Sequence, residues 1–210
     1  MNNIYNTYLE IFVNNLNSIL QLNKILNKDF FKICNISSGF FYSIKKLENA
    51  SFLCYVRIAE ALNLPLQILF IDQSDWKIVT GIVPLEYTEE NALHSLINCS
   101  DKDIRINIKE INDESVLNAA NVYLNFFVEN IKIILSNKEI SQTKLAKHIG
   151  VTQAYINNII NRKQIPSIYL MIDIANYLNV SLFDLLNVPE KFQLGVQDQY
   201  KRYLFKVICV

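Results

Sequence analysis

The chain has few of the residues from which enzymes and cofactor-binding proteins build their active sites. Only four glycines occur in 210 residues, none of them in a glycine-rich phosphate loop, and Ser, His and Asp do not cluster as in a hydrolase. The two histidines, His94 and His148, have no second metal ligand nearby. The sequence therefore argues against an enzyme, and we expect no catalytic residue, no cofactor and no metal site.

Cysteine is also scarce, and its spacing is uninformative for metals. The four cysteines form no C-x-x-C pair, and two of them, Cys34 and Cys54, fall on apolar stripes. Reduced thiols buried in a core are favoured over a disulfide or a metal site.

Long apolar runs are missing as well. No segment approaches the ~18–20 apolar residues that a membrane-spanning helix needs, and residues 1–5 lack the charged start of a secretory signal. The 51% hydrophobic content is ample for buried cores. We therefore expect a cytoplasmic protein of one or two domains that does not use a membrane.

The most informative segment, residues 140–159, is typical of two short helices joined by a tight turn. Gly150 stands where the chain turns, a place that often requires positive φ. Ser141 and Thr152 precede the two helices and can act as N-caps. Each helix has an apolar stripe, formed by Leu145 and Ile149 on the first and by Ile156 and Ile159 on the second.

The second helix directs its apolar stripe inward and leaves a polar face outside. That face consists of Gln153, Ala154, Tyr155, Asn157 and Asn158. Side-chain amides are suited to hydrogen bonding with base edges, adenine above all. The pattern predicts a helix that reads double-stranded DNA.

Residues 130–186 resemble the helix-turn-helix domain of the Cro and lambdoid-phage-repressor family, also called XRE-type regulators. One departure follows the second helix, where the family often has Glu and then Gly and this chain has Ile160, Asn161 and Arg162. The matching positions are Ser141, Gln142, Leu145, Ala146, Gly150, Val151, Thr152, Gln153, Ile156, Ile159, Pro166, Ser167, Ile174, Ala175, Leu178, Val180, Ser181, Leu185 and Leu186.

The resemblance implies that the helix at 152–161 enters the major groove, with its first residues facing the bases. For Tyr155, packing of the ring over the helix start is an open alternative to base contact. Lys132 and Lys138 are assigned to the solvated surface. The implied DNA-binding residues are Gln142, which matches the family's phosphate-contacting glutamine, Thr152, Gln153, Ala154, Tyr155, Asn157, Asn158, and the backbone-gripping group Asn161, Arg162 and Lys163.

A search for internal repeats shows that the sequence around this segment occurs twice. Residues 8–16 recur as 123–131, an offset of 115, and the offset becomes 116 before the pairing of Ile58-Ala59 with Ile174-Ala175. The fold class we expect is mainly α, with two tandem five-helix Cro/repressor-like domains. They are joined by a mixed connector with possible short strands.

The first copy differs from the second at the positions that shape a DNA reader. Phe31 replaces the small helix-crossing residue Ala146, Asn35 replaces the turn residue Gly150, and Asn27 replaces Gln142. Close-packed cores resist added volume, so Phe31 is expected to push the helices apart.

The helix of the first copy that corresponds to the reading helix is expected to expose Phe40 and Tyr42 instead of amides. Exposed aromatic residues favour protein contact, so we assign this copy to assembly or partner binding. The alternative keeps some DNA contact through Lys45 and Lys46.

The predicted organisation is therefore 1–79 (unit one, a degenerate helix-turn-helix domain), 80–119 (connector), 120–195 (unit two, the DNA-binding domain) and 196–210 (tail). Residues 71–126 contain four basic against ten acidic residues, although the whole chain is neutral. An acidic connector should lie away from DNA. Within it, 76–84 and 103–109 favour extended structure and 87–97 favours a helix.

One helix-turn-helix covers only a few base pairs, so specificity normally requires two. The sequence favours a transcriptional regulator, most simply a repressor. It would act as a homodimer on a pseudo-palindromic operator, with unit one, the connector or the tail as the interface. If both copies read DNA, a monomer could instead bind an asymmetric site. The alternative is a protein-interaction or antitoxin-like module that uses the same fold to bind a protein partner through unit one.

Overall fold

The computed structural model describes residues 3–46, 51–72, 108 and 110–189, and within these ranges all regular structure is helical. Five helical elements precede the connector: α1 (Asn3–Leu22), α2 (Asn27–Cys34), α3 (Ser38–Lys45), α4 (Phe52–Leu62) and the 3₁₀ helix η1 (Leu66–Phe70). Five follow it: α7 (Asp113–Asn137), α8 (Gln142–Ile149), α9 (Gln153–Ile160), α10 (Ile168–Leu178) and α11 (Leu182–Leu186). The prediction of a mainly α protein is confirmed.

The second to fifth elements have the same lengths in both sets. They contain 8, 8, 11 and 5 residues in α2, α3, α4 and η1, and again in α8, α9, α10 and α11. Left-handed backbone conformations also recur at equivalent places, since every non-glycine position of positive φ described in unit one has a counterpart in unit two. The pairs are Lys24 (φ 56°) with Glu139 (52°), Asn35 (49°) with Gly150 (79°), and Asn63 (52°) with Asn179 (51°).

One buried polar contact is repeated as well. The side-chain amide of Asn15 on α1 donates to the carbonyls of Leu69 and Ile71, at 3.0 and 2.7 Å. At the equivalent place on α7, the amide of Asn130 donates to the carbonyls of Leu185 and Asn187, at 3.1 and 2.8 Å. Each asparagine thus ties the first element of its set to the end of the fifth.

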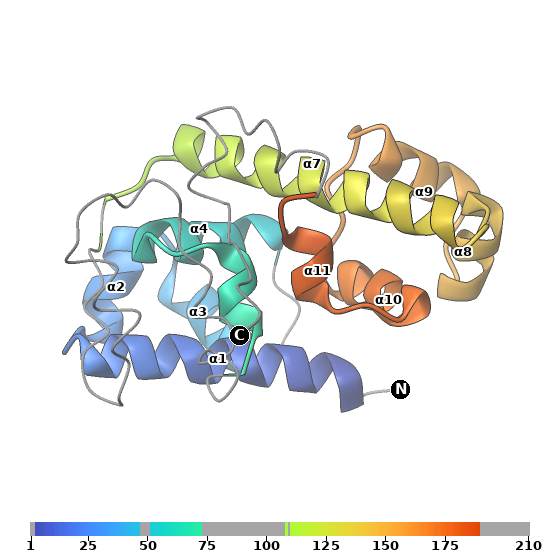
Figure 1. Cartoon of the computed structure of the whole chain (residues 1–210). Helices are drawn as coiled ribbons and strands as arrows, with labels where there is room; N and C mark the ends of the chain where they lie inside the picture. The colour runs from blue at the N-terminus through green and yellow to red at the C-terminus, as the bar shows by residue number, and fades with distance from the viewer. Residues whose placement is uncertain (1–2, 47–50, 73–107, 109, 190–210) are drawn as a thin grey trace, which may run out of the picture.

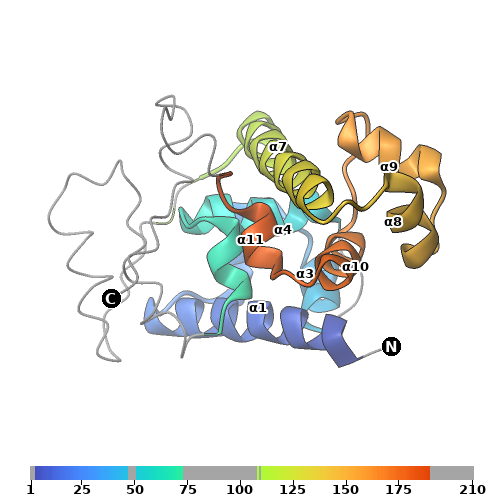
Figure 2. The same ribbon diagram turned by 45° about the vertical axis from the view of Figure 1, so that its right-hand side comes forward.

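The two longest helices form opposite edges of the molecule. α1 and α7 run along the two sides with α4, η1, α11 and α10 between them, and α2 lies at one end while α8 lies at the other (Figure 1). The turned view keeps this order (Figure 2). Apolar residues four apart on each helix, among them Phe12 and Leu16 on α1 and Phe127 and Ile131 on α7, are buried in one continuous core.

The helix α7 begins earlier than the sequence suggested. Residues 113–119, predicted to belong to the connector, form its first two turns and pack beside α4. The reason is local: Asn112 accepts from the backbone N–H of Ser115 at 2.7 Å, and a reciprocal contact from Asn112 N–H to the Ser115 hydroxyl completes a capping box. The helix α7 therefore begins about two turns before the connector boundary predicted at 119.

The remaining predictions for the connector and the tail, at 76–84, 87–97, 103–109 and 196–210, lie outside the described residues, apart from Ile108, which is irregular. Among the helices that the structure describes, none is both long and apolar enough to cross a membrane.

Candidate nucleic-acid interface

The helices α8 and α9 are each fixed at the start by a hydroxyl side chain. The Ser141 hydroxyl accepts from the backbone N–H of Lys144 at 3.2 Å, and the Thr152 hydroxyl accepts from that of Tyr155 at 3.1 Å. Gly150 ends α8 with φ 79° and ψ 26°, the left-handed conformation that glycine adopts at little cost. The caps and the turn predicted from the sequence are confirmed.

The two sides of α9 differ as predicted. Ile156 and Ile159 are each about 1% exposed and belong to the core, together with Ile160. The opposite side is exposed, and it consists of Gln153, Ala154, Asn157 and Asn158. Three side-chain amides therefore face solvent on a helix of only eight residues, which is the arrangement that bidentate contact with a base edge needs.

Tyr155 is half-buried and packs against the core. The packing alternative that the sequence left open is thus supported, and base contact by Tyr155 stays a prediction.

The segment after α9 is held by contacts within the protein. The side-chain amide of Asn161 donates to the backbone carbonyl and to the side-chain oxygen of Asn157, both at 2.9 Å. Arg162, at the place where the family often has glycine, takes positive φ (58°). Its guanidinium donates to the carboxylate of Glu129 on α7 at 2.6 Å.

No local sequence pattern signals this ion pair, because Glu129 and Arg162 are 33 residues apart. Glu129 also accepts from the ammonium of Lys132 at 3.0 Å, and its side chain is only 10% exposed. Two of the cations beside the reading helix are therefore partly neutralised by one carboxylate. Lys163, the third residue of the predicted backbone-gripping group, is exposed.

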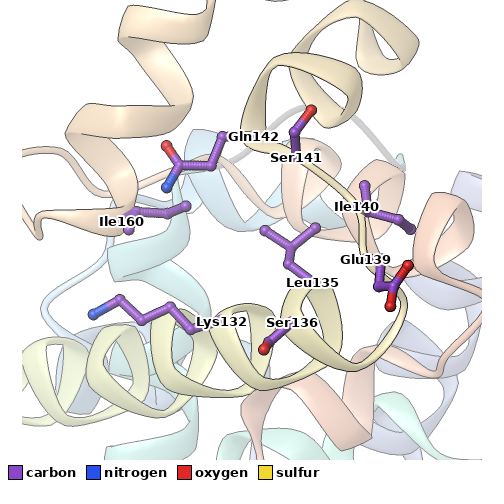
Figure 3. A pocket seen from close by; sticks show the side chains of 8 residues that line it. All are labelled: Lys132, Leu135, Ser136, Glu139, Ile140, Ser141, Gln142 and Ile160. Atoms are coloured by element: carbon purple, nitrogen blue, oxygen red, sulfur yellow. The ribbon is translucent and has the colours of Figure 1, made fainter.

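An open hollow of about 450 Å³ lies between the last turns of α7, the loop that joins α7 to α8, and the first turn of α8 (Figure 3). Lys132 and Ser136 line it from α7, Gln142 from the first turn of α8, and Ile160 from the end of α9. Gln142, the predicted phosphate-contacting residue, is half-buried at its edge. Lys132 is exposed, as predicted, and also lines this hollow.

The corresponding elements of unit one have a different surface. Asn35 takes the left-handed turn at φ 49°, as expected for asparagine, but Leu26 at the start of α2 provides no side-chain cap. Phe31 is 8% exposed, and its ring lies 4.1 Å from that of Phe41 and 6.3 Å from that of Tyr42. Tyr42 is 55% exposed, as predicted. The side chains of Phe40 and Lys45 lie outside the described residues.

The described part of the chain holds no group of three or more potential metal-ligating side chains. His148 stacks on Tyr177 with ring centroids 4.1 Å apart. Cys34 and Cys54 are free thiols, and burial raises the pKa of Cys34 to about 12. Cys34 is thus a core thiol, and Cys99 and Cys209 lie outside the described residues.

Comparison with known protein families identifies the second set of elements. Residues 131–185, from the last two turns of α7 into α11, match the helix-turn-helix family model HTH_3. The match supports an XRE-type helix-turn-helix in this region, and such a domain suggests a DNA-binding regulator. No curated protein and no solved structure gave a significant match.

Proposed function

We propose that the chain is a sequence-specific regulator that binds double-stranded DNA by placing α9 in the major groove. The observation that carries this proposal is the exposed amide face of α9, behind which Ile156 and Ile159 anchor the helix to the core. Gln153 and Asn158 pair with base edges, and the methyl group of Ala154 contacts a thymine methyl. Repression is the simplest output, and we propose no catalytic activity.

Backbone contacts place the helix on the duplex. Gln142 and the hollow at its side face the phosphates next to the groove, where the first N–H groups of α8 favour an anion. Lys163 adds charge at the other end of α9. Arg162 takes part less directly, since its guanidinium is held by Glu129.

The experiment compares three forms of the full chain on duplexes selected from a random pool by the wild type. Gln153→Ala combined with Asn158→Ala removes the proposed base contacts, and each bidentate contact is worth about 1–3 kcal/mol of discrimination. The matched control is Ser38→Ala combined with Ser43→Ala, which changes the equivalent positions of α3. We expect the first variant to lose its preference over random duplexes and the control to keep it.

Equal preference by the wild type and the α9 variant would refute the assignment of the reading residues. Binding measured over a range of salt separates the two kinds of contact, because phosphate contacts determine the salt dependence and base contacts the sequence preference.

A protein-interaction function is the alternative that a specific observation favours. Tyr42 is 55% and Leu26 58% exposed, and both belong to the α2–α3 region of unit one. An antitoxin-like or partner-binding module would use this region and would not need the amides of α9. The same variants discriminate, because this alternative predicts no sequence preference in any of the three proteins.

The sequence favours a homodimer on a pseudo-palindromic operator, in the cytoplasm. Such a dimer needs a surface on which two copies meet. Of the three candidate interfaces, most of the connector and the whole tail lie outside the described residues, and η1 and α4 of unit one already pack against unit two.

A further inference from the structure

The central contact between the two units joins elements that occupy equivalent positions in each. The fifth elements, η1 and α11, pack against each other between the two long helices (Figure 2). The fourth element of unit one, α4, lies beside α7 (Figure 1). A contact of one element with its own counterpart is what a two-fold symmetric interface produces.

Two hydrogen bonds across this interface are reciprocal. The backbone N–H of Leu66, the first residue of η1, donates to the hydroxyl of Tyr123 on α7 at 2.8 Å. The backbone N–H of Leu182, the first residue of α11, donates to the hydroxyl of Tyr8 on α1 at 3.3 Å. Tyr8 and Tyr123 are counterparts in the repeat, and so are Leu66 and Leu182. Each unit thus gives the other the same contact that it receives.

We infer that the chain is an internal pseudo-dimer, in which unit one occupies the place that a second copy of unit two would take in a symmetric dimer. The arrangement of the two units does not depend on the proposed function. Only the kind of DNA site that we expect rests on the proposed DNA binding by α9. The surface of unit two through which a symmetric dimer would form, on α7 and α11, is covered by α4 and η1 of unit one. One chain therefore suffices for one DNA site. Because the two units are covalently linked, their association does not depend on protein concentration.

The DNA site that such a molecule recognises is asymmetric. A two-fold rotation carries α9 onto the position of α3, so α3 takes the place of the second reading helix. The sequence of α3 contains no Asn or Gln. Unit one contributes exposed lysines instead, Lys28 and Lys32 on α2 and Lys46 after α3. Contact of lysine with phosphate gives affinity without sequence preference. We therefore expect α9 to read the base sequence of one half-site, and unit one to bind only the phosphate backbone of the other.

The first experiment measures mass. The full chain, with a mass of 24.4 kDa, is examined by light scattering and native mass spectrometry over a hundredfold range of concentration, alone and on the selected duplex. We expect a monomer throughout, one chain per duplex, and a selected sequence with a single conserved half. Two chains per duplex, or a palindromic selected sequence, would overturn the inference.

The second experiment tests the interface without DNA. Tyr123→Phe removes the acceptor for the Leu66 N–H, and Tyr8→Phe removes the acceptor for the Leu182 N–H. Hydrogen exchange measured by NMR should become faster at Leu66 only in the first variant and at Leu182 only in the second. Tyr42→Phe is the matched control, since its hydroxyl belongs to an exposed side chain of α3, and it should change neither rate.

These results separate this inference from the proposed function. If the reciprocal exchange effects occur in a monomer that selects no duplex, the internal pseudo-dimer stands and the DNA-binding proposal fails. If the protein selects a duplex but the tyrosine variants leave both exchange rates unchanged, DNA binding stands and the internal pseudo-dimer fails.

Discussion

The α2–α3 pair of unit one and the α8–α9 pair of unit two have equal lengths and turns of the same hand, but their surfaces are different. In unit two the helix starts are capped by Ser141 and Thr152, and α9 exposes three amides. In unit one α2 starts at Leu26 without a side-chain cap, and an aromatic cluster of Phe31, Phe41 and Tyr42 fills the space between the helices. The two pairs thus share their backbone arrangement, and they differ in the surface that we propose reads DNA in unit two.

The comparison shows which positions the fold itself requires. Asn15 and Asn130 make the same buried hydrogen bonds in the two units, and Asn63 and Asn179 end α4 and α10 in the same left-handed conformation. Buried backbone carbonyls need a partner, and asparagine is one of the few residues that adopt positive φ readily. The proposed DNA reading depends on other positions, such as 153 and 158, which are exposed and which the fold leaves open to change.

The largest effect is expected from exchanging the residues at the helix crossing. Phe31→Ala leaves a cavity next to Phe41 and should lower the free energy of unfolding by about 3–5 kcal/mol. The reverse change, Ala146→Phe, puts a ring at a position only 2% exposed and should cost about 1–3 kcal/mol. Denaturant unfolding followed by hydrogen exchange in each unit measures both.

DNA binding distinguishes the same two variants. Ala146→Phe displaces α9 and should weaken binding to the selected duplex, whereas Phe31→Ala should leave sequence preference unchanged in the folded fraction. Phe31→Leu serves as the control, with a smaller loss of stability. If Phe31→Ala were as harmless as a surface change, the aromatic cluster would not be part of the core.

The sequence was sufficient for the fold class and for unit two because their signals are local. Apolar spacing, the hydroxyl caps and Gly150 act within one or two turns of helix, and each of them is found where it was predicted. The outward direction of Gln153 and Asn158 follows from the same periodicity. Even the left-handed turn at Asn35 was accessible, because it depends on one residue.

Long-range contacts were beyond the reach of the sequence. The pairing of Arg162 with Glu129 joins residues 33 apart, and the contact of Tyr8 with Leu182 joins residues 174 apart. No pattern within one element signals either contact. The early start of α7 was missed for a different reason, because its cap is an Asn–Ser box that lies in an otherwise acidic, irregular stretch.

The turns at Asn35 and Gly150 provide a second test, for which we expect a change in stability of intermediate size. A Cβ atom added at Gly150 meets no heavy atom within 4 Å, so the cost of substitution comes from the backbone alone. Gly150→Ala at φ 79° should therefore cost roughly 1–2 kcal/mol. Gly150→Asn, which copies Asn35, should cost less, because asparagine tolerates this conformation.

Thermal unfolding of the two Gly150 variants gives the comparison directly, and Asn35→Gly is the reciprocal control. We expect Asn35→Gly to be close to neutral and Asn35→Ala to be destabilising. Equal losses for Gly150→Ala and Gly150→Asn would show that the left-handed turn is not what distinguishes the residues at this position.

The smallest effect is expected at the starts of α2 and α8, because α8 has a side-chain N-cap and α2 has none. Leu26 and Ser141 have nearly the same backbone conformation, with φ −76° and ψ 137° against φ −74° and ψ 151°. A serine at position 26 would therefore place its hydroxyl to accept from the N–H of Asp29, as Ser141 accepts from that of Lys144. Because Leu26 is 58% exposed, little burial is lost. Leu26→Ser should stabilise the protein by about 1 kcal/mol and Ser141→Ala should destabilise it by a similar amount.

Leu26→Ala is the control for the cap, since it removes the leucine without supplying an acceptor, and it should give no gain. Hydrogen exchange at Asp29 should slow in Leu26→Ser alone. A gain of stability in Leu26→Ala equal to that in Leu26→Ser would assign the effect to removal of an exposed leucine. The missing cap would then not be a real difference between the two units, and their divergence would be confined to the helix crossing and to the face of the reading helix.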